Sequence, residues 1–198
     1  MIYVCSDLHF GHDRDFIYVP RGYNNVYDHD RDIIQKWNDL ITDQDDVYIL
    51  GDLMLGDNEY GKQMISQLNG NLHIIYGNHD TDTRIAIYNE LHNVVEMCGY
   101  ATMIKYSKWH FYLSHYPTKT ANYDDSKENV KKNLWNLCGH VHTKDKFLEM
   151  RQGLMSYHVE LDAHGNQPVP IDTVIQDIIH FSSDPLKIFI DECRKNMI

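Results

Sequence analysis

Short runs of apolar and β-branched residues recur along the chain, each of a length typical of a β-strand. We predict strands over Ile2–Cys5, Val47–Leu50, Leu72–Ile75, Val94–Met97, Ala101–Tyr106, His110–Leu113, Leu134–Cys138 and Tyr157–Leu161. Gly99 falls between two of these runs, and the pattern there favours a hairpin that joins residues 94–98 to residues 101–106.

Between some of the strands the apolar positions follow a helical period instead. They recur on one face of Asp32–Thr42 and of Gly61–Leu68, which predicts a helix over each range. Near the end of the chain, Asp184 and Pro185 are typical of the N-cap and first residue of a further helix. Strands alternate with helices early and are denser later, which predicts an α/β sandwich with mixed β-sheets.

Length and composition limit the class of protein. A chain of 198 residues is expected to form a single domain over 1–198, and 42% hydrophobic residues is ordinary for a globular protein. No stretch approaches the roughly 20 apolar residues of a membrane span, and the chain enters its first strand without a secretory segment, so we expect no membrane partner. The four cysteines are scattered without a CxxC pair, which favours a reduced, cytoplasmic setting.

The net charge bears on possible partners. A formal charge of −11 argues against a broad basic surface for nucleic acid, so nucleic acid is a less favoured partner. Bound divalent cations would reverse the sign of the charge locally, which leaves that partner open.

Polar clusters follow the predicted strands at the point where each strand ends. The clusters are Ser6-Asp7-Leu8-His9, Gly51-Asp52, Gly77-Asn78-His79-Asp80, Ser114-His115 and Gly139-His140-Val141-His142. Sites in open α/β sheets form at the carboxyl ends of strands, so we expect these clusters to converge although they are far apart in the sequence.

The converging side chains are of the types that bind metal ions. They are Asp7, His9, Asp52, Asn78, His115, His140 and His142. Mixed oxygen and imidazole donors suit Mn²⁺, Fe, Zn²⁺ or Ni²⁺ better than Ca²⁺. The set is too large for one ion and suits two ions that share a bridging carboxylate. A single DxH or HxH motif is more often structural than metal-binding. A structural role does not explain five such clusters, each at the end of a strand.

The order DxH, GD, GNHD, H and GHxH, from Asp7 to His142, resembles the calcineurin-like metallophosphoesterase superfamily. The stretch from Ser6 to His12 is similar to small single-domain bacterial and phage members, and His158 to Asp162 resembles them more loosely. The resemblance implies a four-layer αββα sandwich with mixed β-sheets and a site at one edge of the sheets.

The resemblance also implies a role for each residue of the motifs. Asp7, His9 and His142 would hold one metal, Asn78, His115 and His140 the other, and Asp52 would bridge the two with a water or hydroxide between the ions. His79 would bind no metal and would face the scissile phosphate, donating a proton to the leaving oxygen or stabilising charge on the phosphoryl group. Asp80 is expected to tie the loop to backbone amides, and Gly77 to let the backbone turn tightly.

One departure from the family pattern argues against a protein phosphatase. Phosphoserine/threonine phosphatases of the superfamily carry an acidic residue three positions after the GD motif and arginines near their motifs, whereas Leu55 stands at the acidic position here. Asp57 either replaces the missing acid or lies in a solvated loop. Arg14, Arg21 and Arg84 are the basic residues nearest the motifs in the sequence, and each either binds phosphate or, as we expect, is solvated.

Three other features leave alternatives open. His12 either contacts substrate or only packs beside the site. The tyrosines of residues 14–29 either stack on a nucleobase or pack against the fold. The segment Thr118–Asn129 is either a flexible lid or an exposed loop.

Together these features predict a dinuclear metal-dependent phosphoesterase that uses a metal-bridging hydroxide. We expect a phosphodiesterase that acts on a nucleotide-type small molecule, with two Mn²⁺ ions, or with Fe, Zn²⁺ or Ni²⁺ in their place. His12, Asn78 and His79 are the expected substrate contacts. The alternatives are a metal-dependent nuclease of the same superfamily and a non-catalytic metal-binding scaffold.

Overall fold

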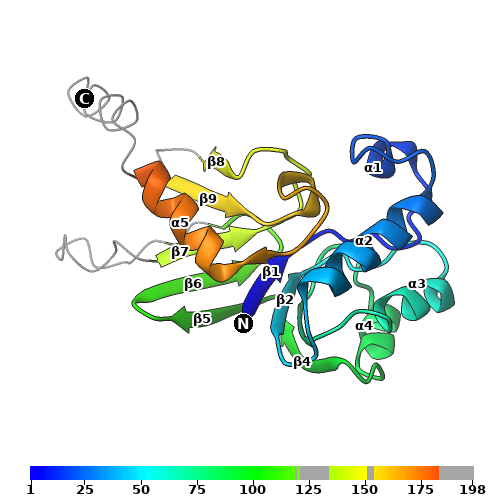
Figure 1. Cartoon of the computed structure of the whole chain (residues 1–198). Helices are drawn as coiled ribbons and strands as arrows, with labels where there is room; N and C mark the ends of the chain where they lie inside the picture. The colour runs from blue at the N-terminus through cyan, green and yellow to red at the C-terminus, as the bar shows by residue number, and fades with distance from the viewer. Residues whose placement is uncertain (119, 121–133, 151–153, 183–198) are drawn as a thin grey trace.

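The computed structural model describes residues 1–118, 120, 134–150 and 154–182 (Figure 1). The helix predicted from Asp184 onward and most of the Thr118–Asn129 segment lie outside these residues. Among the described residues, no helix is both long enough and apolar enough to cross a lipid bilayer.

The strands form two mixed sheets. In spatial order, the first sheet contains β10 (Val169–Pro170), β1 (Ile2–Cys5), β2 (Asp46–Leu50), β3 (Asn71–Ile75) and β4 (Val94–Gly99). Strands β1 to β4 are parallel, and β10 is antiparallel to β1. The second sheet contains β5 (Ala101–Tyr106), β6 (Trp109–Ser114), β7 (Leu134–Cys138), β9 (Leu154–His158) and β8 (Phe147–Met150). Its inner strands β6, β7 and β9 are parallel, and its two outer strands are antiparallel to them.

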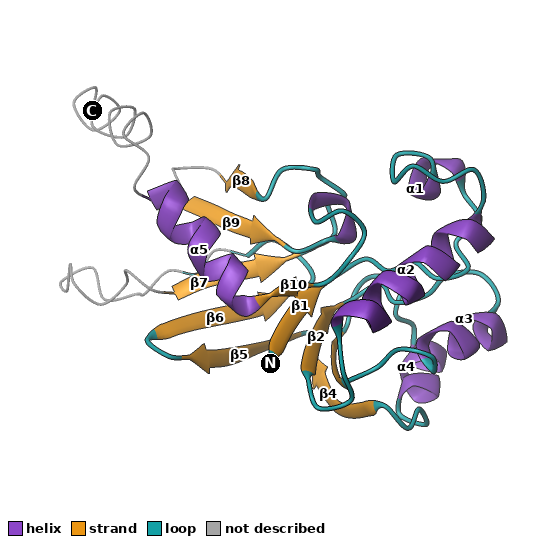
Figure 2. Ribbon diagram, in the orientation of Figure 1, coloured by secondary structure: helices purple, strands orange, loops and turns teal. Residues whose placement is uncertain are grey.

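Helices pack against both sheets (Figure 2). They are α1 (Asp15–Tyr18), α2 (Val26–Leu40), α3 (Asn58–Ile65), α4 (Asp82–Tyr88) and α5 (Ile171–Ser182). Trp37, Ile65 and Tyr88 place α2, α3 and α4 in one core cluster with the first sheet. Val174 of α5 packs with Phe111 of the second sheet in another cluster. The predicted α/β class with mixed β-sheets is therefore confirmed.

Helix α2 is longer than its apolar pattern predicts. The prediction begins at Asp32, whereas the helix begins at Val26, with Asn25 as an N-cap whose side chain accepts a hydrogen bond from the Asp28 amide at 2.9 Å. Its first turns bury His29 and Asp30, which are polar. Buried polar residues interrupt the apolar period, so the sequence pattern does not mark this part of the helix.

The hairpin predicted at Gly99 is wrong. Strand β4 pairs with β3 in the first sheet, whereas β5 pairs with β6 in the second, so the chain crosses between sheets at Gly99 and Tyr100. The strand predicted over Tyr157–Leu161 is also shifted. Strand β9 ends at His158, and a short 3-10 helix begins at Leu161.

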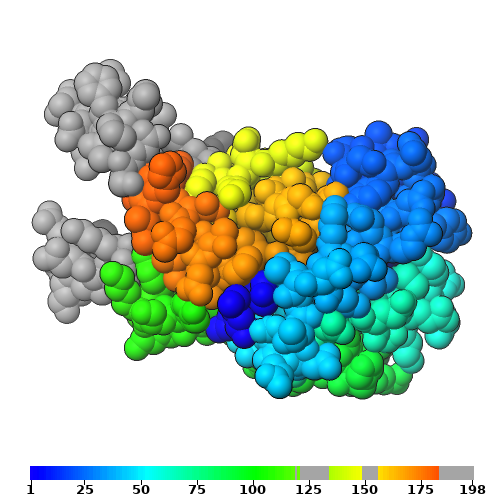
Figure 3. All heavy atoms as spheres, viewed as in Figure 1, coloured from blue at the N-terminus to red at the C-terminus, as the bar shows by residue number. Residues whose placement is uncertain are grey.

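The start of the chain is held between the helical layers. In Figure 3 the N-terminal segment, in dark blue, lies between α2 and α5 on the face shown. The N-terminal ammonium of Met1 donates to Asp45 Oδ1 at 2.5 Å, just before β2 begins. This contact joins the residue before β1 to the residue before β2.

Candidate metal centre

The loops that follow β1, β2, β3, β6 and β7 meet at one edge, as the strand ends predict. Backbone hydrogen bonds join them directly: Asp7 N donates to Gly51 O at 3.0 Å, His9 N to Asp52 O at 3.0 Å, and Gly139 N to His115 O at 3.0 Å. The carboxyl ends of parallel strands lie at the same edge of a sheet, which explains the convergence of residues distant in sequence.

One group of donors consists of Asp7, His9 and His142. The Nε2 atoms of the two histidines lie 3.1 Å apart, and each lies 3.5 Å from Asp7 Oδ1. Asp7 Oδ1 is buried and accepts no hydrogen bond among the described residues. A buried carboxylate oxygen without a partner is costly, and a cation held by these three atoms would satisfy it.

The second group consists of Asn78, His115 and His140. Asn78 Oδ1 lies 2.9 Å from His115 Nε2 and 2.9 Å from His140 Nδ1, and the two ring nitrogens are 3.2 Å apart. His115 is buried, whereas Asn78 and His140 are exposed. One face of this group is therefore open to solvent.

Asp52 lies between the two groups. Its Oδ2 is 3.5 Å from His115 Nε2 and 3.9 Å from His9 Nε2, and its Oδ1 accepts the backbone amide of His79 at 2.9 Å. Burial raises the pKa of the Asp52 carboxyl above its ordinary value. Asp7 is also buried, but the nearby imidazole of His9 holds the pKa of its carboxyl well below the ordinary value.

The backbone at these positions is unusual. Among the described residues seven non-glycine residues have a positive φ, and five of them are Asp7, His9, Asp52, His140 and His142. Left-handed backbone costs an L-residue free energy, and such conformations concentrate at functional sites. The directions of the side chains at this edge thus depend on backbone turns and not on extended strand geometry.

Two glycines leave room for the donors. A Cβ at Gly139 would lie 2.3 Å from Asp7 Oδ2, and a Cβ at Gly77 would lie 2.2 Å from Asp52 Oδ1. Gly77 does not have a positive φ, so its requirement is close approach and not the tight turn expected from the sequence. The carboxylates of both candidate ligands therefore occupy space that any larger residue would fill.

Outer contacts orient two of the histidines. His115 Nδ1 lies 2.8 Å from Leu50 O, and His142 Nδ1 lies 3.1 Å from Asp162 Oδ2. Both oxygens accept hydrogen bonds, so each Nδ1 carries the proton and each Nε2 presents a lone pair to the centre.

Arg21 is buried, so the expectation that it is solvated is wrong. Its Nη2 donates to Asp162 Oδ2 at 2.7 Å and to Asp7 O at 2.9 Å, and its Nε donates to Asp162 Oδ1 at 3.1 Å. The guanidinium therefore joins the carboxylate behind His142 to the backbone of Asp7. No sequence pattern reveals this role, because the carboxylate that pairs with Arg21 is 141 residues away.

The loop that carries Asn78 and His79 is fixed by Asp80, as expected. Asp80 Oδ2 accepts the amides of Asp52 and Gly77, each at 2.8 Å, and Oδ1 accepts the Tyr88 hydroxyl at 2.8 Å. Arg84 is also not simply solvated, because its Nη1 donates to His79 O at 2.5 Å. Arg14, in contrast, is exposed as expected.

His79 and His12 lie beside the donor groups. The His79 side chain is 39% exposed, and its Nε2 lies 3.9 Å from Asp52 Oδ2. The His12 ring lies 5.1 Å from the His9 ring and 6.2 Å from the His79 ring, centroid to centroid. Burial, together with the charge of His79, lowers the pKa of His12 to about 4. His12 thus faces the site as a neutral imidazole.

For Asp57 and for two of the three tyrosines of residues 14–29, the structure favours a structural role, whereas Tyr27 is 67% exposed. Asp57 is exposed and caps helix α3, accepting the Tyr60 amide at 2.8 Å, so it does not replace the missing acid. Tyr18 is buried, and the Tyr23 ring packs edge-on against His29. Packing, and not base stacking, accounts for these two tyrosines.

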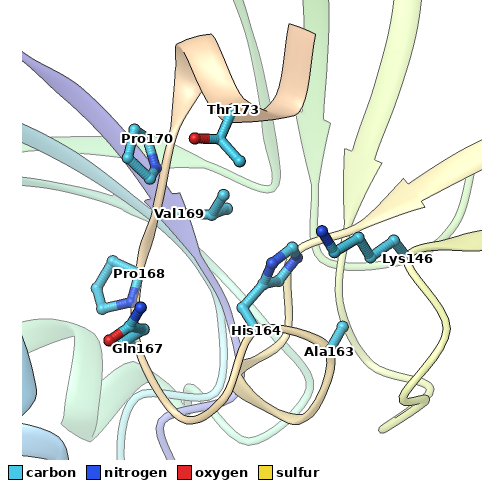
Figure 4. A pocket seen from close by; sticks show the side chains of 8 residues that line it. All are labelled: Lys146, Ala163, His164, Gln167, Pro168, Val169, Pro170 and Thr173. Carbon is cyan, nitrogen blue, oxygen red and sulfur yellow. The ribbon is translucent and has the colours of Figure 1, made fainter. Parts of the chain in front are cut away.

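A separate hollow of about 370 Å³ lies near α5 (Figure 4). Lys146, His164 and Thr173 are among its lining residues, and none of the seven candidate ligands belongs to it. Lys146 is paired with Asp177 at 2.8 Å, so its charge is already neutralised.

Comparisons with known proteins identify the superfamily to which this chain belongs. Residues 1–156 match the family model described as the calcineurin-like phosphoesterase superfamily domain. The chain belongs to this superfamily, which is metal-dependent, and its described residues include groups able to hold metal ions.

Individual proteins resemble this chain over different shares of its length. An uncharacterised protein of Methanocaldococcus jannaschii is 30% identical over 179 residues, covering 88% of this chain and 89% of that protein. The Gene 66 protein of Mycobacterium phage L5 is 33% identical over 78 residues, covering 38% of this chain and 37% of that protein. A solved protein of unknown function from Aquifex aeolicus has a TM-score of 0.65 at 22% identity, covering 89% of this chain and 98% of that one. The last likeness concerns the fold alone.

Proposed function

We propose that this protein is a dinuclear metal-dependent phosphodiesterase that acts on a nucleotide-type small molecule, with Mn²⁺ as the preferred ion. The observation that carries the proposal is the position of Asp52 Oδ2, which lies within 3.9 Å of His9 Nε2 and 3.5 Å of His115 Nε2. One carboxylate between two donor groups is the arrangement that a pair of bridged ions requires. Asp7, His9 and His142 would hold one ion, and Asn78, His115 and His140 the other.

The chemistry divides between the ions and the side chains. Divalent ions bound here would neutralise phosphate charge and lower the pKa of a coordinated water. His79 acts on the other side of the phosphorus: its imidazole donates a proton to the leaving oxygen. The backbone amide of His79 donates to Asp52 and its carbonyl accepts from Arg84, so hydrogen bonds fix the main chain that carries the imidazole.

The basic residues near the site favour a diester over a monoester. The guanidinium of Arg21 is directed at Asp162, and that of Arg84 at the His79 carbonyl. Both guanidinium groups are directed at other parts of the protein and not at substrate. These two residues therefore do not replace the phosphate-binding arginines of the protein phosphatases. A phosphodiester carries one negative charge fewer than a monoester dianion and needs less cationic support.

Exposed aromatic rings beside the centre support a nucleotide-type substrate. The Phe16 ring lies 5.6 Å from His12 and the residue is 70% exposed. The Tyr116 ring lies 4.7 Å from His140 and the residue is 48% exposed. Such rings offer stacking faces to a base, and stacking tolerates any base.

The proposal includes a cytoplasmic setting. Cys5, Cys98 and Cys138 are free thiols among the described residues. Free thiols are typical of proteins from reducing compartments.

The test is turnover of bis(p-nitrophenyl) phosphate by chelator-treated protein to which Mn²⁺, Fe²⁺, Zn²⁺ or Ni²⁺ is returned. We expect turnover with Mn²⁺, greater than that of p-nitrophenyl phosphate. His79→Ala should lower kcat about 10²- to 10⁴-fold, the range for a lost general acid. His110→Ala, at an exposed position on β6, is the matched control and should leave kcat unchanged.

Two results would replace this proposal. Cleavage of single-stranded DNA or RNA, falling steeply with salt and faster than that of small diesters, would favour a nuclease. No turnover with any of the ions, no tightly held metal by elemental analysis and recovery of a partner protein would favour a non-catalytic scaffold.

A further inference from the structure

A second cluster of metal-binding side chains lies on the first sheet, away from the candidate metal centre. His73 is on β3, and Glu96 and Cys98 are on β4. His73 pairs directly with Glu96 across the two strands, and Cys98 lies two residues further along β4, on the same face. The donor atoms of all three residues lie within 4.8 Å of one another. None of the three belongs to the seven candidate ligands at the carboxyl edge.

The imidazole of His73 is held with one nitrogen turned toward this cluster. Its Nδ1 lies 2.7 Å from Glu96 Oε2, and its Nε2 lies 3.3 Å from Asp46 Oδ1. The ring stacks on Tyr48 with centroids 4.4 Å apart and planes 16° apart, and the side chain is 13% exposed. A carboxylate on the far nitrogen of a histidine is the support that metal-binding histidines ordinarily have.

The electrostatics of the cluster favour a cation. Two carboxylates, those of Asp46 and Glu96, flank a single imidazole and a single thiol. A cation would offset both carboxylates and displace the thiol proton, since metal-bound cysteine is a thiolate.

We propose that His73, Glu96 and Cys98 bind a thiophilic divalent cation such as Zn²⁺. Sulfur, imidazole nitrogen and carboxylate oxygen are all Zn²⁺ ligands, and a water or a shifted Asp46 completes four-coordination. On binding, the Cys98 S–H bond breaks, its proton passes to solvent, and the sulfur electron pair forms the bond to the cation. The bound ion ties β3 to β4 where their pairing is irregular, with register shifts on either side of His73 and Ile74.

Co²⁺ spectroscopy distinguishes this site from the candidate metal centre. The centre offers only nitrogen and oxygen donors, so a thiolate-to-cobalt charge-transfer band in the near ultraviolet reports on a cysteine alone. Full-length protein is freed of metal with a chelator and titrated with Co²⁺. We expect the band to grow to one cobalt–thiolate site per chain, and to be displaced by Zn²⁺.

Four variants make the result decisive. Cys98→Ser should abolish the band, and His73→Ala should weaken Co²⁺ binding at this site at least tenfold. Asp52→Asn, which disrupts the candidate metal centre, should retain the band, so the outcome does not depend on the proposed phosphodiesterase activity. Cys193→Ser is the matched control and should also retain it.

Three outcomes would overturn the proposal: no band in the wild-type protein at saturating Co²⁺, a band that persists in Cys98→Ser, or a band lost in Cys193→Ser. Circular dichroism and bis(p-nitrophenyl) phosphate turnover with Mn²⁺ should be unchanged in Cys98→Ser. These two readouts separate loss of the second site from loss of the fold.

Discussion

The ion pair between Arg21 and Asp162, which contacts His142, allows a test of how the candidate metal centre is organised. Replacing Asp162 with Asn keeps the size of the side chain but removes the charge that faces Arg21 and the His142 Nδ1 proton. The amide oxygen is a weaker acceptor, so His142 loses part of its fixed orientation and basicity. Loss of such an outer partner typically costs about 10- to 100-fold in metal affinity, or about 1.4 to 2.8 kcal/mol.

The same substitution also affects folding. The Arg21 side chain has 0% exposure, so in the variant a buried guanidinium lacks its carboxylate. Leaving one partner of a buried pair uncompensated costs about 3 kcal/mol or more in the free energy of unfolding. Asp162 lies outside the residues matched by the family model, so this prediction is argued from its contacts.

Isothermal titration of the chelator-treated variant with Mn²⁺ measures the first effect, and urea denaturation of the metal-free protein measures the second. Asp172→Asn is the matched control, because this aspartate is exposed and accepts a hydrogen bond from the Tyr106 hydroxyl at 3.1 Å, away from the candidate metal centre. Wild-type Mn²⁺ affinity in Asp162→Asn, at full occupancy, would refute the orienting role. An unchanged urea midpoint would refute the burial argument for Arg21.

Three further predictions follow from the same contacts. Gly77→Ala should lower Mn²⁺ affinity at least tenfold by titration, since its Cβ would lie 2.2 Å from Asp52 Oδ1; unchanged affinity would contradict the close approach. Tyr88→Phe should lose about 1 to 2 kcal/mol in urea unfolding, because a buried Asp80 oxygen loses its hydroxyl donor; a neutral effect would show that this bond is not needed. The N-terminal ammonium lowers the pKa of Asp45 to about 2, so its stabilisation is fully present above pH 3.8 and is lost as the pH falls toward 2. Asp45→Asn should therefore unfold with a flatter pH dependence than wild type between pH 4 and 2, and parallel curves would contradict this.

The candidate ligands could be predicted from sequence because each follows a strand that is recognisable from its run of apolar residues. Apolar runs mark β1, β2 and β3, and the polar residues immediately after them have no packing role to explain them. Parallel strand ends then bring distant segments together without further information. The same reasoning reaches His115 and His140, which follow β6 and β7.

The supporting residues could not be found in this way. The sequence does not distinguish a buried arginine from a solvated one, and no pattern links Arg21 to Asp162, which is 141 residues further along the chain. The sheet change at Gly99 is also invisible locally, because pairing partners come from other parts of the chain. Helix α5 is different: Ile171, Val174, Ile175 and Ile178 recur at helical spacing, and the prediction omitted a pattern that was readable.

The left-handed backbone at five of the candidate ligands limits how this chemistry could be moved elsewhere. Seven side chains copied onto the strand ends of another parallel sheet would point in the wrong directions, because ordinary extended strand ends do not turn in this way. A transplant would have to carry the whole loops, including Gly77 and Gly139, whose missing side chains leave room for the carboxylates. The unit that evolution or a designer can transfer from this protein is therefore a set of main-chain turns, because these turns determine where the carboxylates and imidazoles point.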